Sequence, residues 1–203
     1  MKDLERALRD HAARLPAEPP ARIGELVAAR AADEGLLDVA YGWVDSPLGR
    51  LTVAATPRGL VRLAYPFRDP EAVLQDLARK VSPRMLEAPE RLDDVRRELD
   101  EYFHGKRRDF DLAIDWSFTG GFVLNVLRAT AQIPFGDVKT YTEVATEAGS
   151  PRAVRAAGNA LGSNPIPVVV PCHRVVRTGG GLGGYTGGLE RKEFLLRLEG
   201  QQV

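Results

Sequence analysis

The sequence predicts an α+β fold with two unlike halves, and three observations support this prediction. Apolar residues alternate with a period of two between about residues 39 and 65, as in strands with one buried face. Before and after this stretch, apolar residues recur at the spacing of an amphipathic helix. In the second half, a short helix, a glycine-containing turn and another helix follow one another, which is a helix-turn-helix pattern.

Residues 1–37 are expected to form a helical N-terminal extension. Leu4 and Leu8 lie on one helical stripe, which Pro16 ends because proline cannot continue a helix. A second helix is expected from Ile23 to Gly35, where glycine can adopt the left-handed conformation that closes many helices.

Residues 38–115 are expected to form an α+β unit. Three short strands joined by turns with proline and glycine indicate an antiparallel meander, and they span residues 39–43, 51–55 and 60–65. A helix capped by Asp69 and a helix over residues 92–103 follow, and residues 112–114 are expected to add an edge strand.

Residues 116–203 are expected to form a helical domain. Thr140 can cap a short helix, and Gly149 makes a turn. Pro151 suits the first position of the next helix, which is expected to run from Arg152 to about Leu161. An apolar stretch with three polar residues at 172–174 comes next, and a final helix closes the domain.

The formal net charge is zero, with 28 basic and 28 acidic side chains, which excludes a protein that coats DNA indiscriminately. The charge is divided unevenly, because residues 1–116 hold 19 basic and 22 acidic side chains while residues 117–203 hold 9 and 6. Residues 148–189 contain no acid and four arginines, which favours a contact with phosphates there: Arg152, Arg155, Arg174 and Arg177.

The composition excludes other classes. No apolar run approaches the roughly 18 residues of a membrane span, and the N-terminus lacks the apolar core of a secretion signal. A single cysteine excludes an intrachain disulfide and a zinc site built from several cysteines. We therefore expect a cytoplasmic protein without a metal ion and without a membrane partner.

Cys172 has two interpretations. It is either a small buried apolar residue or a nucleophile whose thiolate is favoured by the neighbouring His173 and Arg174. Seven glycines between residues 179 and 188 lack the Lys-Ser or Lys-Thr pair of a phosphate loop. They form either a mobile surface loop or a segment whose backbone closely approaches a ligand, with Tyr185 and Thr186 placed to touch it.

Pro171-Cys172-His173-Arg174-Val175 resembles the signature around the acceptor cysteine of the O6-alkylguanine-DNA alkyltransferases, also called methylated-DNA–protein-cysteine S-methyltransferases. The resemblance extends from about residue 133 to 200 and includes the Gly-Tyr-Thr-Gly-Gly loop. It implies a ribonuclease-H-like fold for residues 38–115 and a winged helix-turn-helix-like domain that carries the cysteine for residues 116–203. Residues 1–37 have no recognised counterpart in the family.

The resemblance implies direct-reversal DNA repair. The protein would flip an O6-alkylguanine out of double-stranded DNA and move the alkyl group irreversibly to its own cysteine, once per molecule. It would act without a cofactor, as a monomer, and be associated with the nucleoid during repair. Some members hold a structural zinc ion through cysteine and histidine, which the single cysteine of this chain makes unexpected.

The resemblance also implies roles for individual residues. Cys172 is the expected acceptor, His173 the base that withdraws its proton through a water, and Glu199 the carboxylate that orients the histidine. Tyr141 is expected to rotate the target phosphate and to protonate the leaving guanine. Asn164 is expected to tie the helix-turn-helix to the active-site segment.

Two further groups of residues follow from the resemblance. Arg155 is expected to enter the duplex in place of the flipped base. The expected DNA contacts are Arg155, Tyr141, Arg152, Ala156 and Arg174, and the expected walls of the base pocket are Tyr185, Thr186, Gly183, Val175 and Pro167.

Three alternatives were weighed against repair. A protein that only binds alkylated DNA and recruits another repair pathway usually replaces the acceptor, so Cys172 argues against it. A regulator that uses the alkylated cysteine as a signal needs a further domain that residues 1–37 are too short to supply. A redox protein needs a second, resolving cysteine, which this sequence does not contain.

Overall fold

The structure is a computed structural model, of which residues 24, 26–28, 30–31 and 34–202 are described. The helix expected around Leu4 lies outside these residues. The described residues between 24 and 31 are helical, and Gly35 has a φ of +68°, as expected of a residue that closes a helix. Ala28 packs against Ala40 and Ala88, which attaches this segment to the sheet.

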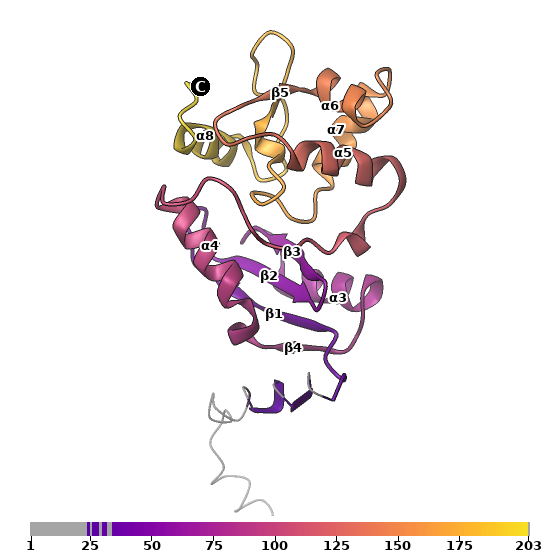
Figure 1. Cartoon of the computed structure of the whole chain (residues 1–203), viewed down its shortest axis with the longest axis vertical. Helices are drawn as coiled ribbons and strands as arrows, with labels where there is room; N and C mark the ends of the chain where they lie inside the picture. The colour runs from indigo at the N-terminus through magenta and orange to yellow at the C-terminus, as the bar shows by residue number, and fades with distance from the viewer. Residues whose placement is uncertain (1–23, 25, 29, 32–33, 203) are drawn as a thin grey trace, which may run out of the picture.

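Four strands form one sheet in the order β3-β2-β1-β4 (Figure 1). β1 (Val39–Val44), β2 (Leu51–Thr56) and β3 (Gly59–Ala64) pair antiparallel, which confirms the predicted meander. β4 (Met85–Glu87), a strand that the sequence did not indicate, pairs parallel with β1, so the sheet is mixed rather than antiparallel throughout. The edge strand predicted at residues 112–114 is reduced to an isolated bridge between Leu60 and Ile114.

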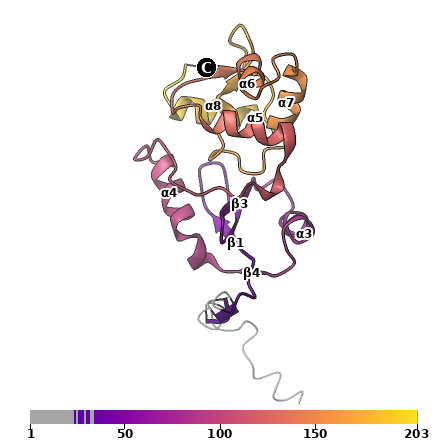
Figure 2. The ribbon, with the colours of Figure 1, turned by 45° about the vertical axis from the view of Figure 1, so that its right-hand side comes forward.

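Two helices cover opposite faces of this sheet (Figure 2). α3 (Pro70–Lys80) packs on the face that includes Ala54, and Asp69 caps it as predicted. α4 (Asp93–Phe103) packs on the face that includes Val53. Because Val53 and Ala54 are consecutive in β2, their side chains point to opposite faces.

The second half of the chain lies beyond β3 in Figure 1. It contains α5 (Gly121–Ala131), β5 (Lys139–Thr140), α6 (Tyr141–Glu147), α7 (Val154–Gly162), β6 (Val175–Val176) and α8 (Leu189–Leu198). The predicted cap is confirmed, because Thr140 and Glu143 form a reciprocal capping box. The helix α7 begins two residues later than predicted, since Pro151 and Arg152 lie in the preceding turn.

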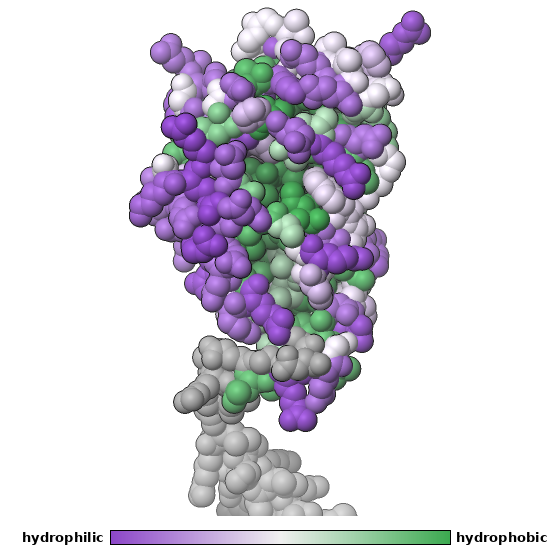
Figure 3. Space-filling model, viewed as in Figure 1, coloured by the Kyte–Doolittle hydropathy of each residue, from purple (hydrophilic) through white to green (hydrophobic). Residues whose placement is uncertain are grey.

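The two halves share a core. Leu127, Ile166 and Leu195 belong to the same buried cluster as the α4 face of the sheet. In addition, the backbone N–H of Leu63 in β3 donates a hydrogen bond of 2.9 Å to the carbonyl of Pro165. Figure 3, drawn in the view of Figure 1, shows apolar residues gathered in the middle of the molecule, where the two halves meet. The sheet therefore directly supports the segment that precedes Cys172.

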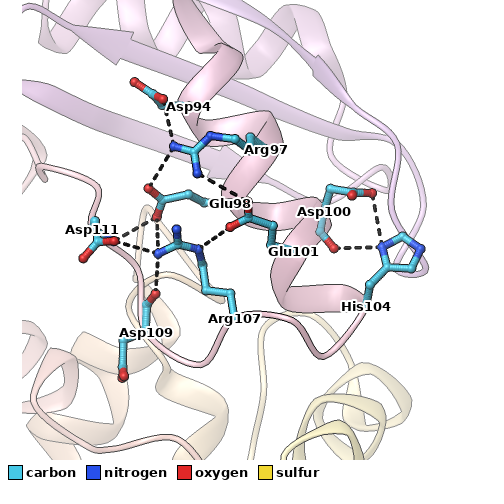
Figure 4. Close-up of polar contacts among 9 residues, drawn as sticks. All are labelled: Asp94, Arg97, Glu98, Asp100, Glu101, His104, Arg107, Asp109 and Asp111. Carbon is cyan, nitrogen blue, oxygen red and sulfur yellow. Dashed lines mark hydrogen bonds and ion pairs between the residues drawn. The ribbon is translucent and has the colours of Figure 1, made fainter.

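Charged side chains hold the segment after α4 in place (Figure 4). Arg107 donates hydrogen bonds of 2.7 Å to Glu101 and 2.8 Å to Asp111. Glu98, which is buried, accepts a hydrogen bond of 2.8 Å from the backbone N–H of Asp111. Within the described residues, no group of three or more histidine, cysteine or acidic side chains is arranged to hold a metal ion. We interpret this network as structural.

The helices of the described part of the chain are all too short or too polar to cross a membrane.

We predict that Gly59→Ala lowers the free energy of unfolding by at least about 3 kcal/mol. Gly59 has a φ of +132°, and an added Cβ would lie 2.2 Å from the carbonyl oxygen of Ala113. The matched control is Gly105→Ala, where φ is +69° and no atom lies within 4 Å of the added Cβ, so only about 1 kcal/mol of backbone strain is expected. Urea unfolding of both variants measures the difference, and equal losses would contradict the close approach of residue 113 to β3.

Candidate active site

Cys172 begins a one-turn 3-10 helix, Cys172–Arg174, at the end of the segment that β3 supports. Its side chain is almost completely buried, and the amide nitrogen Nδ2 of Asn164 lies 3.1 Å from Sγ. Burial raises the pKa of the Cys172 thiol to about 11, although the hydrogen bond from Asn164 acts in the opposite direction. The resting residue is therefore a neutral thiol, and the thiolate expected from its basic neighbours is not favoured.

The Asn164 side chain organises the segment that leads to the cysteine. Its Nδ2 also donates to the carbonyl of Val170 at 2.8 Å, and its Oδ1 accepts from the N–H of Ile166 at 3.0 Å. Between them, Val168 has a φ of +75°, which is strained for a β-branched residue. The side chain of Val168 is completely buried, so packing holds this conformation and with it the position of the thiol.

His173 is completely buried, and its Nε2 donates a hydrogen bond of 3.0 Å to Oε1 of Glu199. Because the carboxylate can only accept, the proton of the neutral ring resides on Nε2 and Nδ1 keeps a free lone pair. This Nδ1 is buried and has no hydrogen-bond partner among the described residues. Burial lowers the pKa of His173 more than Glu199 raises it, so the ring is neutral and able to accept a proton.

Glu199 accepts hydrogen bonds from three side chains besides the weaker backbone contact at Gly136. Oε1 accepts from His173, from the hydroxyl of Tyr102 at 2.7 Å and from Nη2 of Arg174 at 2.8 Å, and Oε2 accepts from Nε of Arg174 at 2.9 Å. Burial would raise the pKa of Glu199, but the hydrogen bonds from His173 and Arg174 prevail and lower it to about 2. The carboxylate therefore stays charged.

A cavity of about 590 Å³ opens beside the thiol, a size typical of ligand sites. Cys172, Tyr141 from the start of α6, Arg155 from α7 and Tyr185 and Thr186 from the glycine-rich loop all line it. This loop is thus the wall of a cavity, which favours the ligand-contacting interpretation over that of a free surface loop.

Gly183 is a position where the loop approaches Tyr141. The hydroxyl of Tyr141 donates a hydrogen bond of 3.2 Å to the carbonyl of Gly184. Gly183 has a φ of +73°, and a Cβ there would lie 2.7 Å from the Tyr141 hydroxyl. Only glycine fits this turn while the tyrosine keeps its position.

The structure brings most of the expected residues to this place. Tyr141, Cys172, Tyr185 and Thr186 line the cavity. Asn164 contacts the thiol, and His173, the next residue after Cys172, is paired with Glu199. Arg155, Arg152 and Ala156 are exposed on or just before α7, and Pro167 lines a second cavity that also contains Cys172.

Two expected residues lie elsewhere. Arg174 was expected to contact DNA, but it is buried, with its guanidinium bonded to Glu199 and to the carbonyl of Ile133. Val175 was expected in the base pocket, but its side chain is completely buried in the core beside Val126 and Val144. A guanidinium with a buried carboxylate partner is unavailable to phosphate, so the expected contact of the Arg174 side chain with DNA is wrong. The Val175 side chain is not among those that line the cavity, and its place in the base pocket stays a prediction.

Two residues of the site were not singled out from the sequence. Tyr102 lies on the apolar stripe of α4, so its periodicity indicates only a core residue, and its hydroxyl reaches Glu199 across the domain contact. Lys192 is completely buried and donates to the carbonyls of Val175 and Leu182, on either side of the glycine-rich turn. Burial lowers the pKa of Lys192 to about 8.

A buried cysteine that lines a cavity, next to a histidine paired with a carboxylate and close to a helix-turn-helix, is the arrangement expected of a DNA-binding protein that performs covalent chemistry. Two family profiles match the chain: the ribonuclease-like domain of 6-O-methylguanine DNA methyltransferase over residues 39–116 and its DNA binding domain over residues 121–201. The chain belongs to the 6-O-methylguanine DNA methyltransferase family, which confirms the resemblance seen in the sequence.

Individual relatives agree with this assignment. The methylated-DNA–protein-cysteine methyltransferase of Methanosarcina barkeri is 38% identical over 159 residues, which cover 78% of this chain and 96% of the relative. The inducible enzyme of Bacillus subtilis is 40% identical over 149 residues, covering 72% and 82%. Among solved structures, that of Mycobacterium tuberculosis OGT in complex with DNA has a TM-score of 0.67 at 35% identity, with 79% and 92% of the two chains covered.

We predict that the Cys172 thiol does not ionise between neutral pH and pH 10 in the folded protein, because burial raises its pKa to about 11. Since the chain has one cysteine, carbon-13 labelling of cysteine gives a single Cβ resonance whose shift reports the titration. The unfolded chain in urea is the control and should titrate near ~8.5. Asn164→Ala should raise the folded value further, and a folded midpoint below pH 8 would contradict the buried neutral thiol.

Proposed function

We propose that the chain repairs O6-alkylguanine in double-stranded DNA by transferring the alkyl group to Cys172, once per molecule. The observation that carries this proposal is the free, buried Nδ1 of His173 next in sequence to a neutral thiol that lines the cavity. The names of the relatives support the same reaction. We propose that the protein acts in the cytoplasm, at the nucleoid that contains its DNA substrate.

The reaction requires a base and an acid. The thiol proton passes through a bridging water to Nδ1 of His173, and the charged Glu199 stabilises the imidazolium that results. Sγ then forms a bond to the alkyl carbon while the bond from that carbon to O6 breaks and its electron pair stays on the guanine. Tyr141 supplies a proton to the departing ring, an assistance typically worth ~10²–10⁴-fold in rate. The proton held by His173 then returns through solvent to the Tyr141 oxygen, so that in the net reaction the guanine gains the proton that the thiol loses.

The thiolate forms only when substrate is in place. The pKa of Cys172 is raised to about 11 and that of His173 is lowered, so proton transfer between them is unfavourable in the resting protein. When an alkyl carbon is bound, the thiolate reacts with it as soon as it forms, and this shifts the proton-transfer equilibrium towards His173. This arrangement protects a nucleophile that is used once from unwanted oxidation or alkylation. The product is a thioether, and no residue of the site is proposed to hydrolyse it.

The DNA contact is assigned to α7 and the turn before it. Arg155 is exposed and lines the cavity, and small residues such as Ala156 and Gly158 let the helix lie close to the duplex. A base in the stack cannot reach a thiol that is almost completely buried, so the alkylated guanine must be extruded. Arg155 is proposed to fill the space that it leaves.

We predict that incubation with a duplex containing O6-methylguanine adds one methyl group to the peptide that contains Cys172, as measured by mass spectrometry. Cys172→Ala should bind the same duplex and leave its methyl group in place. An unchanged mass together with intact binding would favour the alternative of a lesion-binding protein. Removal of more than one methyl group per protein molecule would contradict the single-turnover mechanism.

We predict that Arg155→Ala slows methyl transfer from duplex DNA by roughly 10- to 100-fold, because stabilising an extruded base is worth a few kcal/mol. Transfer from the free base O6-methylguanine should change much less, since that substrate needs no extrusion. Arg128→Ala, an exposed arginine on α5, is the control for a general loss of positive charge. Equal slowing with both substrates would remove the proposed role of Arg155 in extrusion.

A further inference from the structure

A second cavity, of about 230 Å³, also contains Cys172. Asn164, Pro167 and Tyr185 line it from the C-terminal half, and Tyr65, Arg62 and Arg68 line it from the N-terminal half. The thiol is thus shared by two cavities, one bounded by α6, α7 and the glycine-rich loop and one between the halves of the chain. A guanine that approaches from the first cavity presents its alkyl group to Sγ, so the second cavity is available for whatever extends beyond the reacting carbon.

Aromatic rings form one wall of this second cavity. The hydroxyls of Tyr65 and Tyr185 are 2.6 Å apart, and Tyr65 stacks on Phe67 with ring centroids 5.8 Å apart and planes 18° apart. A Cβ at Gly187 would lie 2.6 Å from Tyr185 and 2.7 Å from Tyr65, so glycine permits these rings to meet. Such a wall suits an alkyl chain.

Positively charged side chains also line this cavity. Arg62, Arg68 and Lys80 line it together with one acid, Asp76. This acid already accepts hydrogen bonds from Arg79 at 2.8 Å and from Lys80 at 3.0 Å. The cations therefore exceed the acid that could neutralise them.

The guanidinium of Arg62, in the lining of this cavity, has an N–H group without a hydrogen-bond partner among the described residues. This group is Nε, which is buried, and the guanidinium lies 5.5 Å from the ring centre of Phe118. A buried N–H of a charged group without a partner is costly, and an anion in the cavity would satisfy it. The next residue, Leu63, is hydrogen-bonded to Pro165, which fixes Arg62 close to the segment that carries Asn164 and Cys172.

We propose that Arg62 and Arg68 make the protein favour O6-alkyl groups that end in a carboxylate, with the chain lying in this cavity. The proposal rests on the proposed transfer to Cys172 and names its substrate class. The reaction is unchanged: Sγ bonds to the carbon attached to O6, the bond to O6 breaks, and the guanine gains the proton that the thiol loses. A methyl group carries no carboxylate that the arginines could bind.

The experiment compares two adducts of equal chain length in otherwise identical duplexes, O6-butylguanine and O6-(3-carboxypropyl)guanine. The measured quantity is the ratio of their single-turnover rate constants, with O6-methylguanine as a separate measure of the transfer itself. We expect the wild-type protein to favour the carboxypropyl adduct by roughly 5-fold, as a partly exposed ion pair permits. The preference should weaken as salt is raised, because salt screens the attraction.

Two variants test whether Arg62 and Arg68 cause the preference for the carboxypropyl adduct. Arg62→Met keeps the packing on Phe118, and Arg68→Glu reverses an exposed charge with little risk to folding. Each should bring the ratio to about one or below, while Arg50→Met, an arginine over Trp43 that does not line the cavity, should keep the wild-type ratio.

Two results would overturn the proposal while transfer to Cys172 stands: normal methyl transfer with no reaction of either longer adduct, or a ratio that neither Arg62→Met nor Arg68→Glu changes. Loss of methyl transfer in the wild-type protein would instead contradict the proposed function.

Discussion

The carboxylate of Glu199 is the group on which the rest of the structure depends. It is buried at the end of α8 and remains charged, so several hydrogen-bond donors must surround its two oxygens. Tyr102 comes to it from α4, and His173 and Arg174 come from the 3-10 helix of the cysteine. One buried charge therefore docks the two halves of the chain and fixes the proton of His173 on Nε2. The packing of the two halves and the proposed base therefore depend on the same interaction.

The N-terminal half consequently belongs to the site. Tyr102 helps to orient the carboxylate that holds the base, Leu63 supports the segment before Cys172, and Tyr65 contacts Tyr185 in the cavity wall. The C-terminal half contains the side chains that are proposed to react, and contacts from the sheet and from α4 help to fix their positions.

The sequence predicts those parts of this structure that local pattern determines. Alternating residues identify the meander, and Thr140 as a capping residue identifies the start of α6. β4 could not be predicted because three residues are too few to show an alternating pattern, and the β1 residues with which it pairs are distant in the chain. Arg174 is misjudged because sequence neighbours of a cysteine need not face it, and its partner Glu199 is 25 residues away. The pairing of His173 with Glu199 was expected only from the family resemblance, since nothing local connects them.

The chain contains one sulfhydryl group, and the proposed reaction consumes it. The unused fraction of any preparation then equals its content of titratable sulfhydryl after denaturation, without a radioactive substrate or an antibody. The loss of sulfhydryl per mole of protein, measured with a colorimetric reagent, therefore gives the fraction of molecules that have already reacted with alkylated DNA.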